Sequence, residues 1–269
     1  MRLVASDLDG TIVGPDNRIS DRTVNAFRKC ADAGIRIVFV TGRPPRWLGP
    51  VREQLGHTGT VICSNGAILY DLEAAQVTWS KPLALEGMFQ AAGIIRSLYP
   101  AVRFAAETVE GFHLEPGFLQ DAGADLLGAV APAPLTESLG PGSRVVKFLA
   151  KVEDVHPDDF LRRVKPEVAH LVSTTHSAPS VPLLEMSAPG LDKAVTLADY
   201  AESLKIDAAD VVAFGDMPND LGMLGWAGRG YAMASGHPAV RSAVSRQAPP
   251  FAEDGVAQVL EDLLRGREF

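Results

Sequence analysis

The sequence is poor in the features that mark secreted and membrane-bound proteins. Cysteine occurs only at Cys30 and Cys63, in unlike contexts, so a disulfide framework is not expected and a reducing compartment fits better. No apolar run reaches the roughly 18 residues that a membrane span needs. The N-terminus leads directly into an apolar strand, without the features of a secretory signal. We therefore expect a soluble, cytoplasmic protein with no membrane partner.

Basic charge is also scarce. The chain has 25 Lys and Arg residues against 33 Asp and Glu residues, for a net charge of −8. A nucleic-acid-binding surface needs a basic face, so nucleic acid is not expected as a partner. Small anionic ligands are still allowed, because a local cationic pocket or a bound divalent ion can dominate the field at a site.

The first part of the chain alternates short apolar segments with amphipathic ones. We expect a strand that ends near Asp7, strands over 35–40 and 60–63, and helices over 21–33 and 44–56. Apolar runs of this kind, joined by helices, predict a buried parallel sheet with right-handed crossovers.

The middle of the chain has a different pattern. After an expected hairpin over 68–71 and 77–81, helices interleave with strands that we expect to be antiparallel. The parallel pattern is expected to resume after Leu183. The predicted fold class is therefore α/β: a Rossmann-like, doubly wound parallel sheet formed by residues 1–81 and 183–269, with an inserted α+β domain at 82–182.

Two carboxylates stand at the end of the first expected strand, in the run Asp7-Leu8-Asp9-Gly10-Thr11. A strand would place Asp7 and Asp9 on one face. A turn at Gly10 could instead move Asp9 away, so the two acids need not share one role. Carboxylates at a buried strand end are costly to desolvate unless a cation, hydrogen bonds or chemistry offset the cost.

Other polar clusters follow predicted strands or begin a predicted helix. They are Thr41-Gly42-Arg43, Lys193, and Asp216 with Asp220. Ligands of open α/β sheets bind at the carboxyl ends of the strands. The three clusters that follow strands therefore point to one site: Asp7 with Asp9, Thr41-Gly42-Arg43, and Asp216 with Asp220. Acids without His or Cys at ligand spacing suit Mg²⁺, while a Thr hydroxyl and a Lys ammonium suit phosphoryl oxygens.

The polar segments that begin at Asp7, Thr41, Lys193 and Asp216 resemble, in this order along the chain, the four motifs of the haloacid dehalogenase (HAD) superfamily. Asp7-Leu8-Asp9-Gly10-Thr11 is similar to motif I of its phosphatases, and Val40-Thr41-Gly42-Arg43 to motif II. Lys193 stands where motif III places its lysine, and the run from Gly215 to Asp220 is similar to motif IV. The large insert, with Ser64-Asn65-Gly66-Ala67 before it, resembles the Cof-type branch with a C2 cap (subclass IIB). The resemblance covers essentially the whole chain.

The resemblance implies a reaction and a metal. Asp7 would attack phosphorus and form an aspartyl-phosphate, and Asp9 would protonate the leaving oxygen and then deprotonate water. Mg²⁺ would be held by the Asp7 carboxylate, the Asp9 backbone carbonyl and Asp216, with Asp220 close by. The cap would close over the site, exclude water and select the leaving group.

The resemblance also implies a set of phosphate-binding or substrate-binding residues. Thr41 and Lys193 would hold the oxygens on which charge accumulates, and Arg43 would either contact substrate or neutralise the acidic site. The expected set is Thr41, Gly42, Arg43, Asn65, Gly66, Lys193 and Asn219. The chain departs from the family pattern at Asp192, which adds a negative charge before the lysine or caps the helix instead.

The expected function is a Mg²⁺-dependent phosphohydrolase of small phosphorylated metabolites, with sugar phosphates first. Alternatives are a phosphomutase, a dedicated phosphatase of the sucrose-phosphate or mannosylglycerate-phosphate type, and a non-catalytic phosphate binder. Each cluster taken alone has a simpler interpretation as a solvated turn or strand exit. The sequence allows a monomer or a homodimer and does not decide between them.

Overall fold

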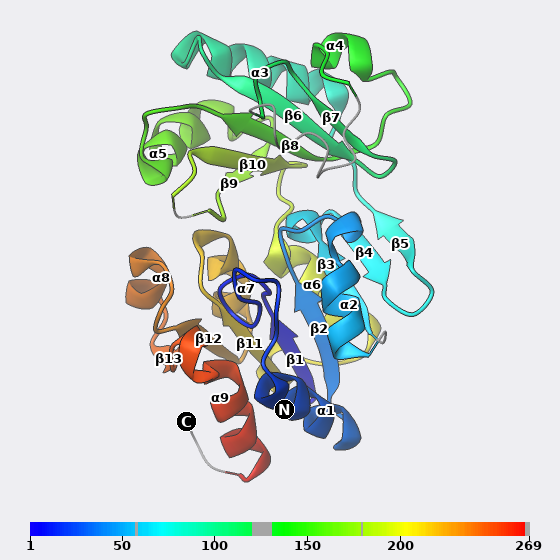
Figure 1. Cartoon of the computed structure of the whole chain (residues 1–269), viewed down its shortest axis with the longest axis vertical. Coiled ribbons are helices and arrows are strands. Elements are labelled where there is room, and N and C mark those ends of the chain that lie inside the picture. The colour runs from blue at the N-terminus through cyan, green and yellow to red at the C-terminus, as the bar shows by residue number, and fades with distance from the viewer. Residues whose placement is uncertain (57–58, 120–130, 179, 267–269) are drawn as a thin grey trace. The chain divides into compact units, whose positions relative to one another are not determined.

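The computed structural model describes residues 1–56, 59–119, 131–178 and 180–266. The chain divides into two compact units (Figure 1). Unit 1 comprises Met1–Trp79 and Asp192–Phe269, and unit 2 comprises Ser80–Leu191. Within the described ranges, no helix combines the length and apolar character needed to cross a bilayer.

Unit 1 is built on an eight-stranded sheet in the order β13-β12-β11-β1-β2-β3-β4-β5. The strand β1 lies between β11 and β2, with Leu3 beside both Val211 and Arg36, and all three run parallel. The strand β4 runs antiparallel to its neighbour β3. The strands are β1 (Leu3–Ser6), β2 (Arg36–Val40), β3 (Thr60–Cys63), β4 (Ile68–Asp71), β5 (Gln76–Ser80), β11 (Val211–Gly215), β12 (Arg229–Met233) and β13 (Arg246–Ala248).

Helices cover both faces of this sheet, as Figure 1 shows. On one face, buried side chains of β1 and β2 pack against Leu197 of α6 and Met223 of α7. On the other, Phe27 of α1 meets Phe39 of β2 edge-on, with ring centroids 5.3 Å apart. The doubly wound α/β prediction is therefore confirmed. The helices are α1 (Asp21–Asp32), α2 (Gly49–Leu55), α6 (Lys193–Ser203), α7 (Leu221–Trp226), α8 (Pro238–Ala243) and α9 (Gly255–Leu264), with short 3₁₀ turns η1 (Pro45–Trp47), η2 (Ser64–Gly66), η4 (Ala208–Asp210), η5 (Pro218–Asp220) and η6 (Phe251–Glu253).

Unit 2 is an α+β layer around a five-stranded sheet in the order β7-β6-β8-β10-β9. The pairings recorded within this sheet are antiparallel. Phe104, Phe148 and Met186 of the sheet pack in one cluster with Ile95 of α3 and Phe160 of α5. The elements are α3 (Leu85–Leu98), β6 (Arg103–Thr108), β7 (Phe112–Leu114), α4 (Leu135–Ser138), β8 (Val145–Lys151), α5 (Pro157–Val168), β9 (Ser173–Thr175) and β10 (Leu183–Ser187).

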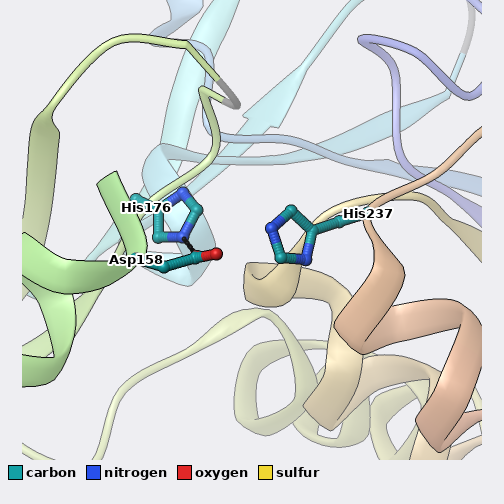
Figure 2. Close-up of side chains that lie close together, drawn as sticks. All are labelled: Asp158, His176 and His237. Carbon is teal, nitrogen blue, oxygen red and sulfur yellow. Dashed lines mark hydrogen bonds and ion pairs between the residues drawn. The ribbon is translucent and has the colours of Figure 1, made fainter. Parts of the chain in front are cut away.

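Polar pairs also tie unit 2 together. The buried Lys147 of β8 donates to Glu185 of β10 across 2.9 Å. His176, which follows β9, lies 2.8 Å from Asp158 of α5, with Nε2 toward the carboxylate (Figure 2). The second pair links the helix layer to the end of the sheet's edge strand.

The structure corrects the point at which the chain returns to unit 1. The expected boundary lies at residue 183, but β10 pairs antiparallel with β8 and β9 in the sheet of unit 2, and unit 1 resumes at Asp192. Leu184 and Met186 pack with the helices of unit 2. An apolar strand carries no local mark of the sheet it will join, because long-range packing selects its neighbours.

Two smaller differences concern local elements. The expected helix over 44–56 is divided into η1 and α2, and α2 is followed by Gly56 in the left-handed conformation. The edge strand β13 was not expected. Its sequence Arg-Gln-Ala has no apolar alternation, and it is defined by pairing with β12.

Candidate active site

The candidate site lies at the carboxyl edge of the unit 1 sheet. Asp7 directly follows β1, Asp216 follows β11, Thr41 follows β2 and Ser64 follows β3. These strands are sequential neighbours in the sheet and run parallel, so the residues after them meet at one edge. Each of these residues stands at the end of its own strand, and the order of the strands in the sheet brings them together into one site.

Lys193 joins two of the acids. It is the first residue of α6, is 1% exposed, and its Nζ donates to Asp7 Oδ1 across 2.5 Å and to Asp220 Oδ1 across 2.7 Å. Asp192 caps the helix, with Oδ1 accepting from Val195 N across 2.9 Å. Of the two roles considered for Asp192, the structure shows the cap, which fixes where the lysine leaves the helix.

Asp220 is held by the loop that follows β11. It is fully buried, and its Oδ2 accepts from the backbone N–H groups of Asp216 and Met217 at 3.0 and 2.9 Å. Its other oxygen faces Lys193. Because both oxygens have donors, the buried charge is satisfied, and the loop holds Asp216 beside it.

Three carboxylates of this cluster fit a divalent cation. Asp7, Asp216 and Asp220 each offer an oxygen, and these atoms lie within 4.8 Å of one another. Burial and then the charge of Asp220 raise the pKa of Asp216 from 3.8 to about 7, against a hydrogen bond from Thr11 that lowers it. Oxygen donors alone, crowded and poorly solvated, are the set that Mg²⁺ prefers.

Asp7 and Lys193 are in contact, and the charge of each one shifts the pKa of the other. Burial raises the pKa of the Asp7 carboxyl well above its ordinary value, although the charge of Lys193 lowers it. Burial lowers the pKa of the Lys193 ammonium, but the charges and hydrogen bonds of Asp220 and Asp7 outweigh burial and raise it. Lys193 therefore stays charged, and a cation bound by the carboxylates would favour the ionised form of Asp7 and Asp216.

Asp9 stands apart from the buried cluster. Its side chain is 56% exposed, and it forms a two-pronged ion pair with Arg43: Nε to Oδ2 across 2.8 Å and Nη2 to Oδ1 across 2.5 Å. Gly10, at φ +78°, turns the chain between the two motif acids. The expectation that this turn separates Asp7 from Asp9 agrees with these contacts.

The segment after β3 supplies further polar groups. Ser64, Asn65 and Gly66 have φ values of +51°, +56° and +104° in succession. Asn65 Oδ1 accepts from Asn219 Nδ2 across 3.1 Å, and Gly66 O accepts from Thr196 Oγ1 across 2.7 Å. Such a run of left-handed residues stores backbone strain, which is typical of functional segments.

Other expected residues are placed as follows. Thr41 is fully buried, and its Oγ1 accepts from the backbone N–H of Arg43 across 3.0 Å. Gly42 lies between these two residues. All the expected site residues belong to unit 1. Asp7, Lys193, Asp216 and Asp220 form the buried cluster, Asp9 and Arg43 form the exposed pair, and Asn65 and Asn219 form a third contact.

Several residues at the site had no role predicted from the sequence. Thr11 donates to Asp216 Oδ1 across 3.1 Å, although it was already part of the first motif. Ser64 Oγ is buried and has no hydrogen-bond partner among the described residues, as is also true of Oδ1 of the expected residue Asn219. Asn17 accepts from Arg43 across 2.8 Å and lies in a turn that carried no functional signal.

Comparison with known proteins connects this geometry to a family. The family model described as haloacid dehalogenase-like hydrolase matches residues 4–260. The 5-amino-6-(5-phospho-D-ribitylamino)uracil phosphatase YitU of Bacillus subtilis strain 168 is 31% identical over 266 residues, which cover 97% of this chain and 96% of the relative.

Two further likenesses cover most of the chain. The HMP-PP phosphatase of Yersinia pseudotuberculosis serotype O:1b is 26% identical over 256 residues, which cover 89% of this chain and 86% of that protein. The solved structure of a HAD subclass IIB sugar phosphatase matches with a TM-score of 0.80 at 20% identity, covering 98% of this chain and 99% of that chain. At this identity the structural likeness shows the shared fold alone.

Proposed function

Because the chain belongs to the haloacid dehalogenase-like hydrolases and is a phosphatase of that family, we propose that it is a Mg²⁺-dependent phosphohydrolase of small phosphorylated metabolites. The alternative of a non-catalytic phosphate binder is thereby rejected. The resemblance to the Cof-type branch holds. We assign unit 1 as the catalytic core and unit 2 as the C2-type cap.

The observation that carries the proposal is the position of Asp7. Its carboxylate is buried at the end of β1 and is in contact with the Lys193 ammonium. A carboxylate so held is pointed at one reaction centre and is poised to attack phosphorus in line, forming an aspartyl-phosphate. Asp7, Asp216 and the Asp9 backbone carbonyl, with Asp220 beside them, would hold Mg²⁺, which would supply positive charge that offsets the repulsion between carboxylate and phosphate.

The remaining residues divide the other tasks. Asp9, the exposed acid, protonates the leaving oxygen and later removes a proton from the attacking water. Lys193 and Thr41 bind the oxygens on which negative charge develops. Gly42, Asn65, Gly66 and Asn219 contact phosphate or substrate. Asn219 Oδ1 can accept a hydrogen bond from a hydroxylated ligand, and Ser64 Oγ can donate or accept one, since neither atom has a partner among the described residues.

Sugar phosphates and related phosphorylated polyols are the proposed substrate class. The Bacillus subtilis relative is named for a compound that carries phosphate on a ribityl chain, and the Yersinia relative for HMP-PP. Both names describe small phosphorylated metabolites. They define the first compounds to test, together with hexose and pentose phosphates, sucrose-phosphate and mannosylglycerate-phosphate.

The test is phosphate release from this panel and from p-nitrophenyl phosphate, with Mg²⁺ and with EDTA. Wild type should turn over at least one sugar or polyol phosphate only with Mg²⁺. Asp7→Asn should lose at least about 1,000-fold in kcat because the nucleophile is gone. Asp32→Asn, at an exposed position on α1, is the matched control and should be unchanged.

Three results would contradict the proposal. The first is a folded wild type that releases no phosphate from any compound of the panel. The second is turnover by wild type that EDTA does not reduce, and the third is an Asp7→Asn variant that keeps wild-type activity. Transfer of the phosphoryl group to a second sugar, without release of inorganic phosphate, would instead identify a phosphomutase.

A further inference from the structure

The motif alone leaves two roles open for Arg43, contact with substrate or neutralisation of the acidic site. Its ion pair with Asp9 indicates a more specific role. We propose that Arg43 is a positioning residue for the acid–base Asp9, held in place by Asn17, and that it is not a ligand of the transferred phosphate. This inference rests on the proposed phosphatase function, because it assumes that Asp9 exchanges the proton with the leaving group.

The first support is the geometry of the pair. Nε and Nη2 of Arg43 reach separate oxygens of Asp9 at 2.8 and 2.5 Å. A guanidinium and a carboxylate joined in this way are coplanar, so the pair fixes the direction of the carboxylate as well as its position. Since the Asp9 side chain is 56% exposed, little else in the described structure restrains it.

The second support is the use of the guanidinium's donors. Besides Asp9, Nη2 donates to Asn17 Oδ1 across 2.8 Å, and Nη1 donates to the Trp47 carbonyl across 3.4 Å. Nε is used once, Nη2 twice and Nη1 once, which leaves a single N–H of Nη1 without an acceptor among the described residues. A bidentate phosphate contact would require Arg43 to release Asp9 or Asn17.

The third support is that Arg43 is itself immobilised. Its backbone N–H donates to Thr41 Oγ1 across 3.0 Å, and its carbonyl accepts from Ser64 N across 3.1 Å. Asn17 is also held, because its carbonyl accepts from Gln54 Nε2 across 2.8 Å. The support for Asp9 therefore runs from the ends of β2 and β3 and from α2, through Arg43.

The two roles for Arg43 predict different substrate dependence. An alkoxide needs a proton to leave, whereas p-nitrophenolate leaves without one. The ratio kcat/KM covers the steps up to phosphorylation of Asp7, and therefore includes the leaving-group proton but not the later water attack. A positioning residue for Asp9 should matter for alkyl phosphates and hardly for p-nitrophenyl phosphate, while a phosphate ligand should matter equally for both.

The experiment measures kcat/KM of wild type, Arg43→Ala, Arg43→Lys and Asn17→Ala on p-nitrophenyl phosphate and on an alkyl phosphate that wild type hydrolyses. We expect Arg43→Ala to lose about 100-fold on the alkyl phosphate and less than about 5-fold on p-nitrophenyl phosphate. Arg43→Lys and Asn17→Ala should lose less than Arg43→Ala, with the same selectivity. Added guanidinium should restore part of the alkyl phosphate activity of Arg43→Ala.

A double-mutant cycle gives the decisive comparison. In an Asp9→Asn background, Arg43→Ala should cause no further loss on either substrate, because the group it positions has been removed. Arg22→Ala is the matched control: Arg22 forms a two-pronged pair with Glu261 on the surface, and its removal should leave both ratios unchanged.

Equal losses on both substrates, or a full additional loss in the Asp9→Asn background, would overturn the proposal and identify Arg43 as a phosphate ligand. Thermal melts of each variant report on folding, and Asn17→Ala provides the same test if Arg43→Ala does not fold. A wild type without phosphatase activity would instead contradict the proposed function.

Discussion

Two ion pairs stand at the same edge of the unit 1 sheet and differ in almost every physical respect. Lys193 is 1% exposed and is shared by the buried Asp7 and Asp220. The side chains of Arg43 and Asp9 are 11% and 56% exposed. Removing one partner of a buried pair costs about 3–5 kcal/mol, whereas an exposed pair contributes about 0.2–1 kcal/mol.

The difference separates a buried, shared contact from an exposed, directional one. In the proposed mechanism the nucleophile and the metal-binding acids need one geometry, which burial and Lys193 provide. In the same mechanism Asp9 exchanges protons with a leaving group and then with a water, so its carboxylate needs a defined direction while it stays accessible. A weakly stabilising but directional pair with Arg43 meets that need.

The largest expected effect is that of Lys193→Met, which leaves Asp7 and Asp220 without their shared cation. We expect a loss of about 3–5 kcal/mol in the free energy of unfolding and of at least about 100-fold in kcat. Urea denaturation and phosphate release measure the two. Lys29→Met, on the exposed face of α1, is the control. A loss of less than about 1 kcal/mol would break the contrast between the buried and exposed pairs.

The next effect is a pH dependence of the metal-free protein. The pKa of Asp216 rises from 3.8 to about 7, so the folded state holds this proton more tightly than the unfolded state. Its contribution to stability is therefore present below about pH 4 and is lost as the pH rises toward 7. In EDTA, wild type should lose on the order of 5 °C in Tm between pH 5 and 8 relative to Asp216→Asn, and Mg²⁺ should remove this loss. Parallel Tm curves for the two proteins would contradict it.

A smaller effect is expected at Thr11, whose hydroxyl donates to Asp216. This bond lowers the pKa of Asp216 and so favours the ionised form that binds a cation. Thr11→Val should weaken Mg²⁺ binding about fivefold at pH 7, equivalent to about 1 kcal/mol. Activity titrated with Mg²⁺ measures the shift. Thr78→Val, on the edge strand β5, should leave the titration unchanged.

The smallest effect on stability is expected for Arg43→Ala. The pair with Asp9 is exposed on one side, so its removal should cost about 1 kcal/mol or less in the free energy of unfolding. Urea denaturation of Arg43→Ala and Lys193→Met under the same conditions compares their free energies of unfolding. Equal destabilisation by the two variants would mean that the exposed pair is as structural as the buried one.

Much of unit 1 was predictable because the sequence signals for its strands are local. The apolar runs before Asp7, Thr41 and Asp216 identify strands, and a parallel sheet brings their carboxyl ends to one edge. The order of the four motifs along the chain then favoured a functional role for these residues over a simple role in strand-to-loop transitions. The assignment of β10 was wrong for the opposite reason, since the run Leu183–Ser187 fits either sheet.

Short-range periodicity and motif order were enough to predict where the strands of unit 1 end and which acids, hydroxyls and lysine stand there. The pairing of these side chains became visible only in the folded chain. The fold shares Lys193 between Asp7 and Asp220, joins Asp9 to Arg43, and assigns β10 to unit 2. Residues 7 and 193 lie 186 positions apart in the chain, and such contacts are set by packing of the whole unit, which no local pattern encodes.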